Sequence, residues 1–413
     1  MSFSSNRVAT ANMYESALRN MNTRQSSLVN LQENLTSGKR VLRASDDPVA
    51  AAQAERSMTR ISRIQTEQRA LDVQRNAVAQ AESTLGDAIG LMQEMRELVV
   101  SAGSGIFNNS DRATVANQLQ GLRTQLQDVA NRKDTNGVPL LSALGSAAAP
   151  FLNALGEFGG LAGQMSGSAV AIPNTLDGDS AFMFQPQRDG VYNAGVTLAS
   201  PAGRSLNTDA VRAVDFTQIN GDKYTLNFTS VAATVPADGT TTATYTITND
   251  TTGAPPTTVN AIFPSDKPAS IAVTGVPGLS FNIKGTPATG DTVSLESSKS
   301  IFDVVDSAIR DIGGAGSSSA AAQAVGQALA NMDTGLARLQ TVRSNAGELL
   351  NRADRISGNQ ETRSVQLEAD RSRAEDLDMI QAISDFQNQQ VGNEAALKSY
   401  AMVQKLSLFN FIS

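Results

Sequence analysis

Residues 35–48 read LTSGKRVLRASDDP, and this stretch decides the architecture because one helical pattern ends in it. Gly38 can adopt the left-handed conformation that ends a helix, as glycine often does just past the last helical residue. Lys39 and Arg40 follow, where the negative end of a helix dipole favours cations. We therefore expect the first long helix to stop at Gly38.

A second helix begins at the other end of the same stretch. Ser45, Asp46 and Asp47 offer side-chain oxygens to the free amides of a following helix. Pro48 fits the first helical turn, where its missing N–H costs nothing. The two carboxylates also suit acid–base chemistry, but capping explains adjacent Asp residues before Pro better. The stretch predicts two long helices joined by a short elbow.

The prolines divide the chain into three parts. Twelve of the 13 prolines lie between Pro139 and Pro287, and the remaining one is Pro48. Both ends of the chain are thus free of helix breakers, and the middle is rich in them. In the middle part the apolar period changes to two, as in Tyr224, Leu226 and Phe228, which is typical of antiparallel strands. We predict a mainly α protein with an inserted antiparallel β domain.

The helical ends carry apolar residues at steps of three and four, which is the spacing of a coiled-coil seam. Gln25, Gln32 and Gln390 interrupt the seams with polar side chains. Such stripes need a partner, and each end is the nearest candidate for the other. The residues that we expect to carry assembly or partner binding are Leu18, Met21, Leu28, Leu31, Leu35, Ile380, Ile383, Phe386, Leu397, Tyr400, Val403, Leu406, Leu408 and Phe409.

These patterns predict a rod of paired long helices with the β domain at its tip. The helix from residue 48 to 100 alone would run roughly 80 Å. We expect terminal coiled-coil arms, a helical-bundle rod and a Thr/Pro-rich β domain, with these bounds: arms 1–44 and 374–413, rod 45–138 and 301–373, β domain 139–300. Residues 140–170 are rich in Ala, Gly and Ser, and we interpret them as loosely structured.

Composition excludes many chemistries. The chain has no Cys, His or Trp, so thiol nucleophiles, disulfides, Ser-His-Asp triads and the usual zinc sites are absent. Its net charge of −7 argues against nucleic acid as the main partner. No apolar run has transmembrane or signal-peptide length. We expect no cofactor, no metal and no membrane partner. An Asp/Glu-dependent hydrolase in the β domain and a signalling coiled coil stay open as alternatives.

Several motifs, taken in order, resemble the flagellin superfamily. The elbow motifs TSGKRV at 36–41 and SDDP at 45–48 resemble its N-terminal segment, and the DDP form is similar to the hook-associated protein 3 branch. Further likenesses are MY at 13–14, LGD at 85–87, NQL at 117–119, IPNTLDG at 172–178, GTPATGD at 285–291, GELLNR at 347–352 and LSLF at 406–409. TNGVPLL at 135–141 instead resembles flagellin.

The resemblance implies a secreted structural protein of the bacterial flagellum with no enzymatic activity. It would form a ring between another hook-associated junction protein and flagellin. Export would follow the flagellar type III apparatus, with an export chaperone guarding the unfolded chain. A flagellin that forms the filament itself is the alternative, and polymerisation of the purified protein into long filaments would distinguish it.

Overall fold

The structure is a computed structural model that describes residues 3–142, 151, 172–173, 175–201, 203–234 and 239–412. Contacts within the chain divide it into two units. The first unit combines Met1–Ala70 with Arg355–Ser413, and the second is Leu71–Asp354. The two divisions fall inside long helices rather than at the elbow, so the units differ from the arm and rod bounds that the sequence suggested.

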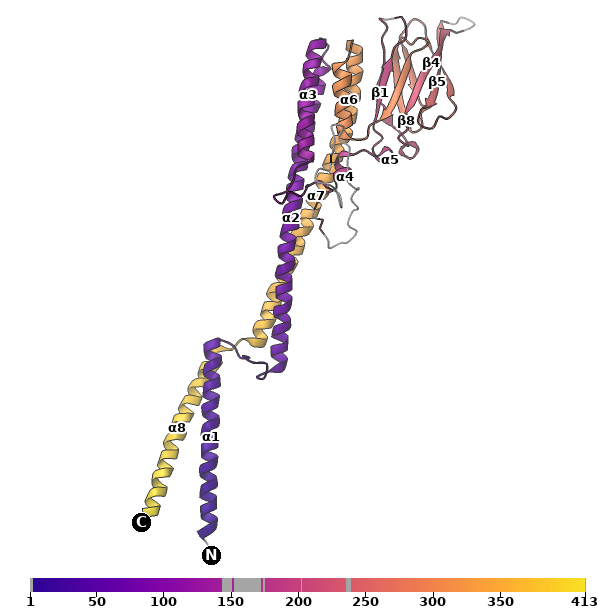
Figure 1. Cartoon of the computed structure of the whole chain (residues 1–413). Helices are drawn as coiled ribbons and strands as arrows, with labels where there is room; N and C mark the ends of the chain where they lie inside the picture. The colour runs from indigo at the N-terminus through magenta and orange to yellow at the C-terminus, as the bar shows by residue number, and fades with distance from the viewer. Residues whose placement is uncertain are drawn as a thin grey trace. The chain divides into compact units, whose positions relative to one another are not determined.

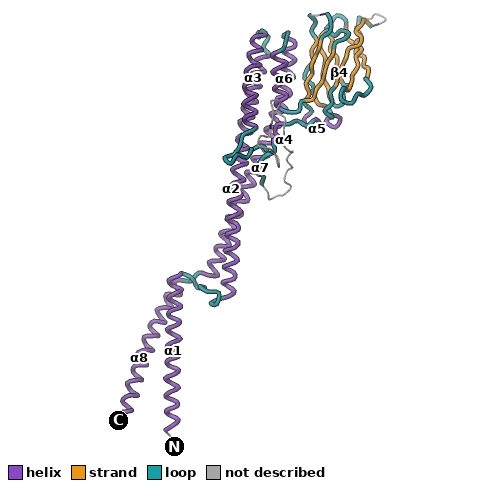
Figure 2. The backbone as a smooth tube through the Cα atoms, viewed as in Figure 1, coloured by secondary structure: helices purple, strands orange, loops and turns teal. Residues whose placement is uncertain are grey.

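Long helices form both ends of the chain, as Figures 1 and 2 show. Gly358 lies within a continuous helix. The helices are α1 (Phe3–Ser37), α2 (Pro48–Ala102), α3 (Asn109–Ala130), α6 (Ile301–Gly313), α7 (Ser318–Glu375) and α8 (Met379–Ile412). The predicted helix starts and stops at Ser37 and Pro48 are confirmed. Helical periodicity at steps of three and four is therefore a sound guide to these elements.

In the second unit, α2 and α7 lie against each other through a buried apolar stripe. Val78, Leu85 and Met92 of α2 are fully buried, as are Met332 and Leu339 of α7. Ion pairs between side chains that are exposed, or half-buried in the case of Glu82, flank the stripe. Their nitrogen–oxygen distances are 2.8 Å for Arg75–Asp354, 2.7 Å for Arg96–Asp333 and 2.7 Å for Arg343–Glu82. Exposed pairs stabilise little, so apolar burial holds these helices together.

An aromatic cluster joins the shorter helices of this unit to the chain that leads into the β domain. Phe302 of α6 lies 5.5 Å from Phe151 and 5.6 Å from Phe182, measured between ring centroids. Arg123 of α3 covers the Phe302 ring at 5.3 Å and pairs with Asp306 at 2.9 Å. All three rings are fully buried. Phe151 lies within the segment 140–170 that was predicted to be loose, as do the buried Leu140 and Leu141, whereas residues 143–150 and 152–170 lie outside the described residues.

The β domain contains two antiparallel sheets around one core. The larger sheet has the strand order β1-β9-β4-β5-β6, and in the smaller one β8 pairs with β2, β3 and β7. The strands are β1 (Tyr192–Thr197), β2 (Leu206–Thr208), β3 (Arg212–Ala213), β4 (Tyr224–Ala233), β5 (Thr240–Asn249), β6 (Thr257–Pro264), β7 (Ala269–Val273), β8 (Leu279–Gly285) and β9 (Thr292–Ser297). The predicted inserted antiparallel domain is confirmed.

Alternation along each strand places one set of side chains in this core. On β4, Tyr224, Leu226 and Phe228 are buried, as the period of two predicted. Three short helices precede or interrupt the strands: α4 (Gly178–Phe182), α5 (Pro186–Asp189) and η1 (Phe216–Gln218). The sequence pattern missed them because elements of three to five residues carry no readable period.

Buried amide side chains of α7 dock one edge of the larger sheet. Gln327 donates to the Tyr192 carbonyl at 2.8 Å and accepts from the Val211 amide at 3.0 Å. Asn331 donates to the same Tyr192 carbonyl at 3.1 Å. One turn earlier, Gln323 donates to the Ala194 carbonyl and accepts from the Thr208 amide, both at 3.1 Å. The carbonyl groups of Tyr192 and Ala194 on the edge strand β1 thus find hydrogen-bond donors on α7.

Candidate assembly site

The elbow after α1 has the backbone conformation that its sequence predicts. Gly38 has a φ of +72°, and its N–H donates to the Asn34 carbonyl at 2.9 Å. This is the left-handed end of a helix that favours glycine. The Gly38 carbonyl in turn accepts from the Leu377 amide at 3.0 Å, and Lys39 forms a β-bridge with Asp376. The connection between α7 and α8 therefore pairs with the connection between α1 and α2.

Two cationic side chains of the connection between α1 and α2 bind the C-terminal end of α7. The Lys39 amine pairs with the Glu375 carboxylate, and the Arg40 amide donates to the Glu375 carbonyl at 2.7 Å. The Arg40 guanidinium donates to the Ala374 carbonyl at 2.8 Å. These carbonyls belong to the last turn of a helix, which lacks internal donors and carries partial negative charge. The two cations thus serve the C-terminal end of α7, a partner that sequence reasoning could not name.

Asp47 caps α2, as predicted. Its carboxylate accepts from the amides of Val49 at 3.2 Å and Ala50 at 3.0 Å, and it lies 3.3 Å from the Arg40 guanidinium. The hydrogen bond from the Ala50 amide, together with the Arg40 guanidinium, lowers the pKa of Asp47 below its ordinary value. Pro48 is the first helical residue.

The capping prediction for Ser45 and Asp46 is wrong in detail. Asp46 accepts from the amides of Leu42 at 3.2 Å and Arg43 at 2.8 Å, so it holds the turn that precedes the helix. The hydrogen bond from the Arg43 amide lowers the pKa of Asp46. The Ser45 hydroxyl lies 3.4 Å from Asp46 and donates to it. The reason is that these residues lie in the turn before Asp47, where the preceding amides are nearer than those of α2.

A small apolar cluster closes the paired connections. Val41, Ala50, Ala54 and Ala374 are buried together. The small alanine side chains allow the start of α2 and the end of α7 to approach each other closely. This cluster and the surrounding hydrogen bonds bind the two connections into one structural element, here called the double elbow: residues 38–47 with 374–378.

The terminal helices α1 and α8 pair with each other, as the sequence predicts. Several of the predicted assembly residues stay exposed to solvent on this helix pair. Ile380 is 86% exposed, Leu397 51%, Ile383 46% and Leu18 45%. Met21, Leu28, Leu31, Leu35, Phe386 and Tyr400 are half-buried. Val403, Leu406, Leu408 and Phe409 lie on α8, and their side chains are outside the described residues.

The seam between α1 and α8 is more polar than the stripes suggested. Ala382 is buried there, and the Arg24 guanidinium lies against the backbone of Gly392. The Gln389 side-chain oxygen is buried without a hydrogen-bond partner. Gln389 and Arg24 take the places that the sequence assigned to their neighbours Gln390 and Gln25. A one-residue shift of this kind follows from the drift between a 3.5-residue seam and a 3.6-residue helix.

Carboxylates elsewhere fulfil structural roles. Asp177 accepts from the Asp179 amide at 3.1 Å and from the Ser180 hydroxyl at 2.7 Å, so it caps α4. Burial, together with the charge of Asp177, raises the pKa of Asp179. The nearby Arg338 donates to the Ser180 carbonyl at 2.8 Å, which ties the short helix to α7. Among the described residues, no cluster of three or more acidic side chains could hold a metal ion.

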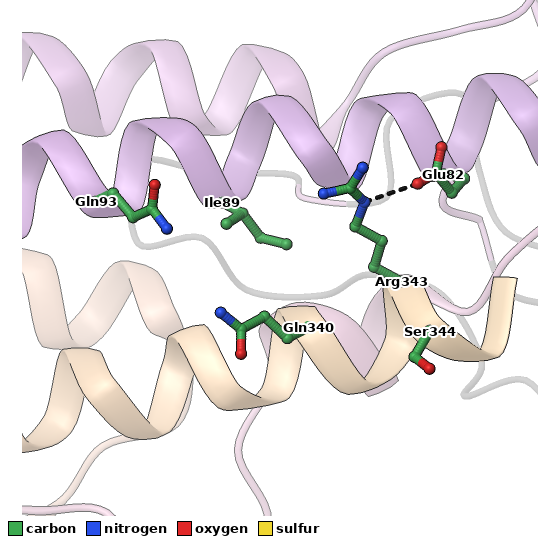
Figure 3. A pocket seen from close by; sticks show the side chains of 6 residues that line it. All are labelled: Glu82, Ile89, Gln93, Gln340, Arg343 and Ser344. Atoms are coloured by element: carbon green, nitrogen blue, oxygen red, sulfur yellow. Dashed lines mark hydrogen bonds and ion pairs between the residues drawn. The ribbon is translucent and has the colours of Figure 1, made fainter. Parts of the chain in front are cut away.

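Two surface hollows of the second unit lie along helix pairs, and a third lies in the β domain between residues 214–218 and 274–280. One lies between α2 and α7, lined by Glu82, Ile89, Gln93, Gln340, Arg343 and Ser344. Figure 3 shows the Arg343–Glu82 pair crossing it from one helix to the other. Its polar lining holds no nucleophile paired with a base, so the geometry offers contact surface rather than catalysis. In the part of the chain that the structure describes, none of the helices is long and apolar enough to cross a membrane.

The N-terminal third of the chain matches a known protein family. Residues 8–145 match the family model of the bacterial flagellin N-terminal helical region. Flagellar hook-associated protein 3 of Salmonella typhimurium is 35% identical over 158 residues, which cover 37% of this chain and 49% of that protein. Its counterpart in Escherichia coli is 28% identical over 215 residues, which cover 51% of this chain and 64% of that protein. The chain thus spans about half to two thirds of these relatives.

A solved structure extends the likeness to the fold. The flagellar junction protein FlgL from Legionella pneumophila superimposes with a TM-score of 0.55 and 25% identity, covering 73% of this chain and 99% of that one. The resemblance to hook-associated protein 3 that the motifs indicated is confirmed.

Proposed function

We propose that this chain, whose residues 8–145 match the family model of the bacterial flagellin N-terminal helical region, is an adaptor of the bacterial flagellum. It assembles into a ring at the hook–filament junction and joins another hook-associated protein to flagellin. The observation that supports this most strongly is the terminal helix pair that follows the double elbow. Two long helices from opposite ends of the chain pair with each other and still expose apolar side chains.

Exposed apolar residues on a helix pair are covered when further copies pack against them. Ile380, Ile383 and Leu397 would become buried between neighbouring copies, and Leu18 would join them from α1. Each aliphatic side chain that is fully buried stabilises the assembly by about 1.5–3 kcal/mol. Because every copy in a ring repeats this gain, contacts that are weak between two copies stabilise the complete ring strongly.

Export before assembly fits the same features. The chain has no Cys, so it forms no disulfide that would obstruct passage in an unfolded state. The apolar stripe of α8 would be exposed in that state and would need protection by a chaperone. We propose the flagellar type III apparatus as the route, an export chaperone as a transient partner, and the extracellular flagellum as the final location.

Complementation of a strain that lacks its hook-associated protein 3 tests the adaptor role. The wild-type chain should restore flagella that contain it between hook and filament. Ile380→Asp should abolish incorporation because it places a charge in the buried contact. Val365→Asp, at an exposed site on α7, is the matched control and should incorporate normally.

The alternative is a flagellin that forms the filament. It draws on the description of the family model, which names flagellin. Purified protein would then polymerise alone into long filaments, and labelled protein would lie along the whole filament. Labelling confined to the junction would contradict this alternative, and labelling along the filament would contradict the adaptor role.

A further inference from the structure

The two edges of the larger β-sheet differ in what covers them. The β1 edge is closed by α7, whose buried Gln327 and Asn331 bind the Tyr192 carbonyl. The opposite edge is β6, which pairs only with β5 among the described residues. An edge strand presents a row of unpaired N–H and C=O groups to any extended segment of suitable chemistry. The β6 edge is therefore a candidate interaction surface.

Nothing in β6 discourages pairing with another strand. Natural edges are blocked by charged side chains, bulges or proline. Residues 257–264 read TTVNAIFP, with no charge and with proline only at the last position. Their register with β5 is continuous from Thr257 to Pro264, without a bulge. Ile262 is 67% exposed on the outer face of this strand. The strand thus lacks all three protections over seven consecutive residues.

We propose that β6 pairs with β6 of a second copy of this chain, antiparallel and about a two-fold axis at Asn260. This register keeps the two faces of each sheet aligned, because it sets residues of like orientation opposite each other. Asn260 faces Asn260, and Thr258 faces Ile262 on the outer face. Val259 faces Ala261 on the inner face. No like charges meet, so the strand is its own complement.

The second copy is the occupant that the chemistry favours. The segment that pairs must be extended, uncharged and free at one edge, and β6 of another copy meets all three conditions. Pairing would join two five-stranded sheets into one continuous ten-stranded sheet. A two-strand contact on its own is marginal in water, so we expect a weak dimer that forms at high protein concentration.

This pairing is distinct from the proposed ring. A ring in which all copies point the same way needs head-to-tail contacts, whereas a pair of identical β6 edges is isologous. The β6 dimer therefore belongs to copies outside the ring. Failure of the dimer would leave the adaptor proposal untouched, and failure of the adaptor proposal would leave the dimer untouched.

Engineered cysteines in the full chain test the register directly, since the native chain has no Cys. Opposed residues of antiparallel strands lie close enough for a disulfide. With diamide as the oxidant, Asn260→Cys alone should form a covalent dimer. Thr258→Cys alone should not, because its partner position is Ile262. A mixture of Thr258→Cys and Ile262→Cys proteins should crosslink again. Thr246→Cys is the control, since it lies on the same face on the inner strand β5.

Sedimentation equilibrium supplies a second readout that needs no crosslink. Ile262→Lys should raise the dimer dissociation constant by at least tenfold, because it places a cation at the edge of each copy. Thr246→Lys carries the same charge away from the edge and should dimerise as the wild type does. The proposal is overturned if Asn260→Cys crosslinks no faster than Thr246→Cys, or if Ile262→Lys and Thr246→Lys have equal dissociation constants.

Discussion

Replacing Gln327 by Ala should weaken the attachment of the β domain to α7. Gln327 is 6% exposed and makes three hydrogen bonds: with the Tyr192 carbonyl at 2.8 Å, the Val211 amide at 3.0 Å and the Asn331 side chain at 3.0 Å. Asn331 still serves the Tyr192 carbonyl after the change. The Val211 amide, in contrast, loses its acceptor in a residue that is 5% exposed. The cost therefore arises from one orphaned donor.

The expected loss follows from that donor. A buried polar group left without a partner costs about 1–3 kcal/mol. Alanine recovers a few tenths of a kcal/mol through its better helix propensity. We therefore expect the free energy of unfolding of the β domain to fall by about 1–2.5 kcal/mol. Gln340→Ala is the matched control, because it makes the same change in the same helix at an exposed position.

Urea unfolding can follow the two parts of the molecule separately. The chain has no Trp, and three of its five tyrosines, Tyr192, Tyr224 and Tyr245, lie in the β domain. Tyrosine fluorescence therefore reports mainly on the β domain, and far-ultraviolet circular dichroism on the helices. Hydrogen exchange at the Val211 amide should accelerate in Gln327→Ala alone. The reasoning is refuted if Gln327→Ala and Gln340→Ala unfold at the same urea concentration with equal exchange at Val211.

Three further outcomes follow from other contacts. Phe302→Ala should destabilise the second unit by about 3–5 kcal/mol, whereas Val100→Ala at an exposed site of α2 should not, as thermal unfolding can measure. The pKa values of Asp46 and Asp47 are lowered in the fold. The stabilisation that these carboxylates give is therefore complete above the unfolded pKa near 4 and is lost as the pH falls through the lower folded values. The helicity of Asp47→Asn, measured by circular dichroism, should respond less to acid than that of the wild type. Hydrogen exchange on dilute protein should show little protection in residues 1–36 and 376–413 and strong protection in 50–100 and 320–356; equal protection would contradict this.

The sequence predicted features that depend on neighbours along the chain. Gly38 and Pro48 mark helix ends because their backbone preferences act locally. The alternation of Tyr224, Leu226 and Phe228 gave the β domain because one face of a strand meets one core. These patterns are carried by consecutive residues, so no knowledge of the rest of the fold is required to interpret them.

Contacts between distant segments were beyond this kind of reasoning. The Gly38 carbonyl binds the amide of Leu377, and Arg40 binds the Ala374 carbonyl, over more than 330 positions. A polar residue such as Gln327 within a helical stripe looks like an exposed interruption, yet it is buried against a strand edge. Backbone groups of a strand carry no side-chain signature, so the sequence gives no sign of the partner that a buried amide will find.

The terminal helices illustrate why assembly and folding are linked in such a chain. Ordering the backbone costs about 1–2 kcal/mol per residue, and α1 and α8 together contain 69 residues. Burial must offset that cost at about 25 cal/mol per Å² of apolar surface. Yet Ile380 and Leu397 are largely exposed, and Gln389 and Arg24 occupy the seam. We therefore expect the two helices to bury too little between themselves to be stable alone. In the proposed assembly, surface contributed by other copies would supply the remainder, so we expect the arms to become ordered as they assemble.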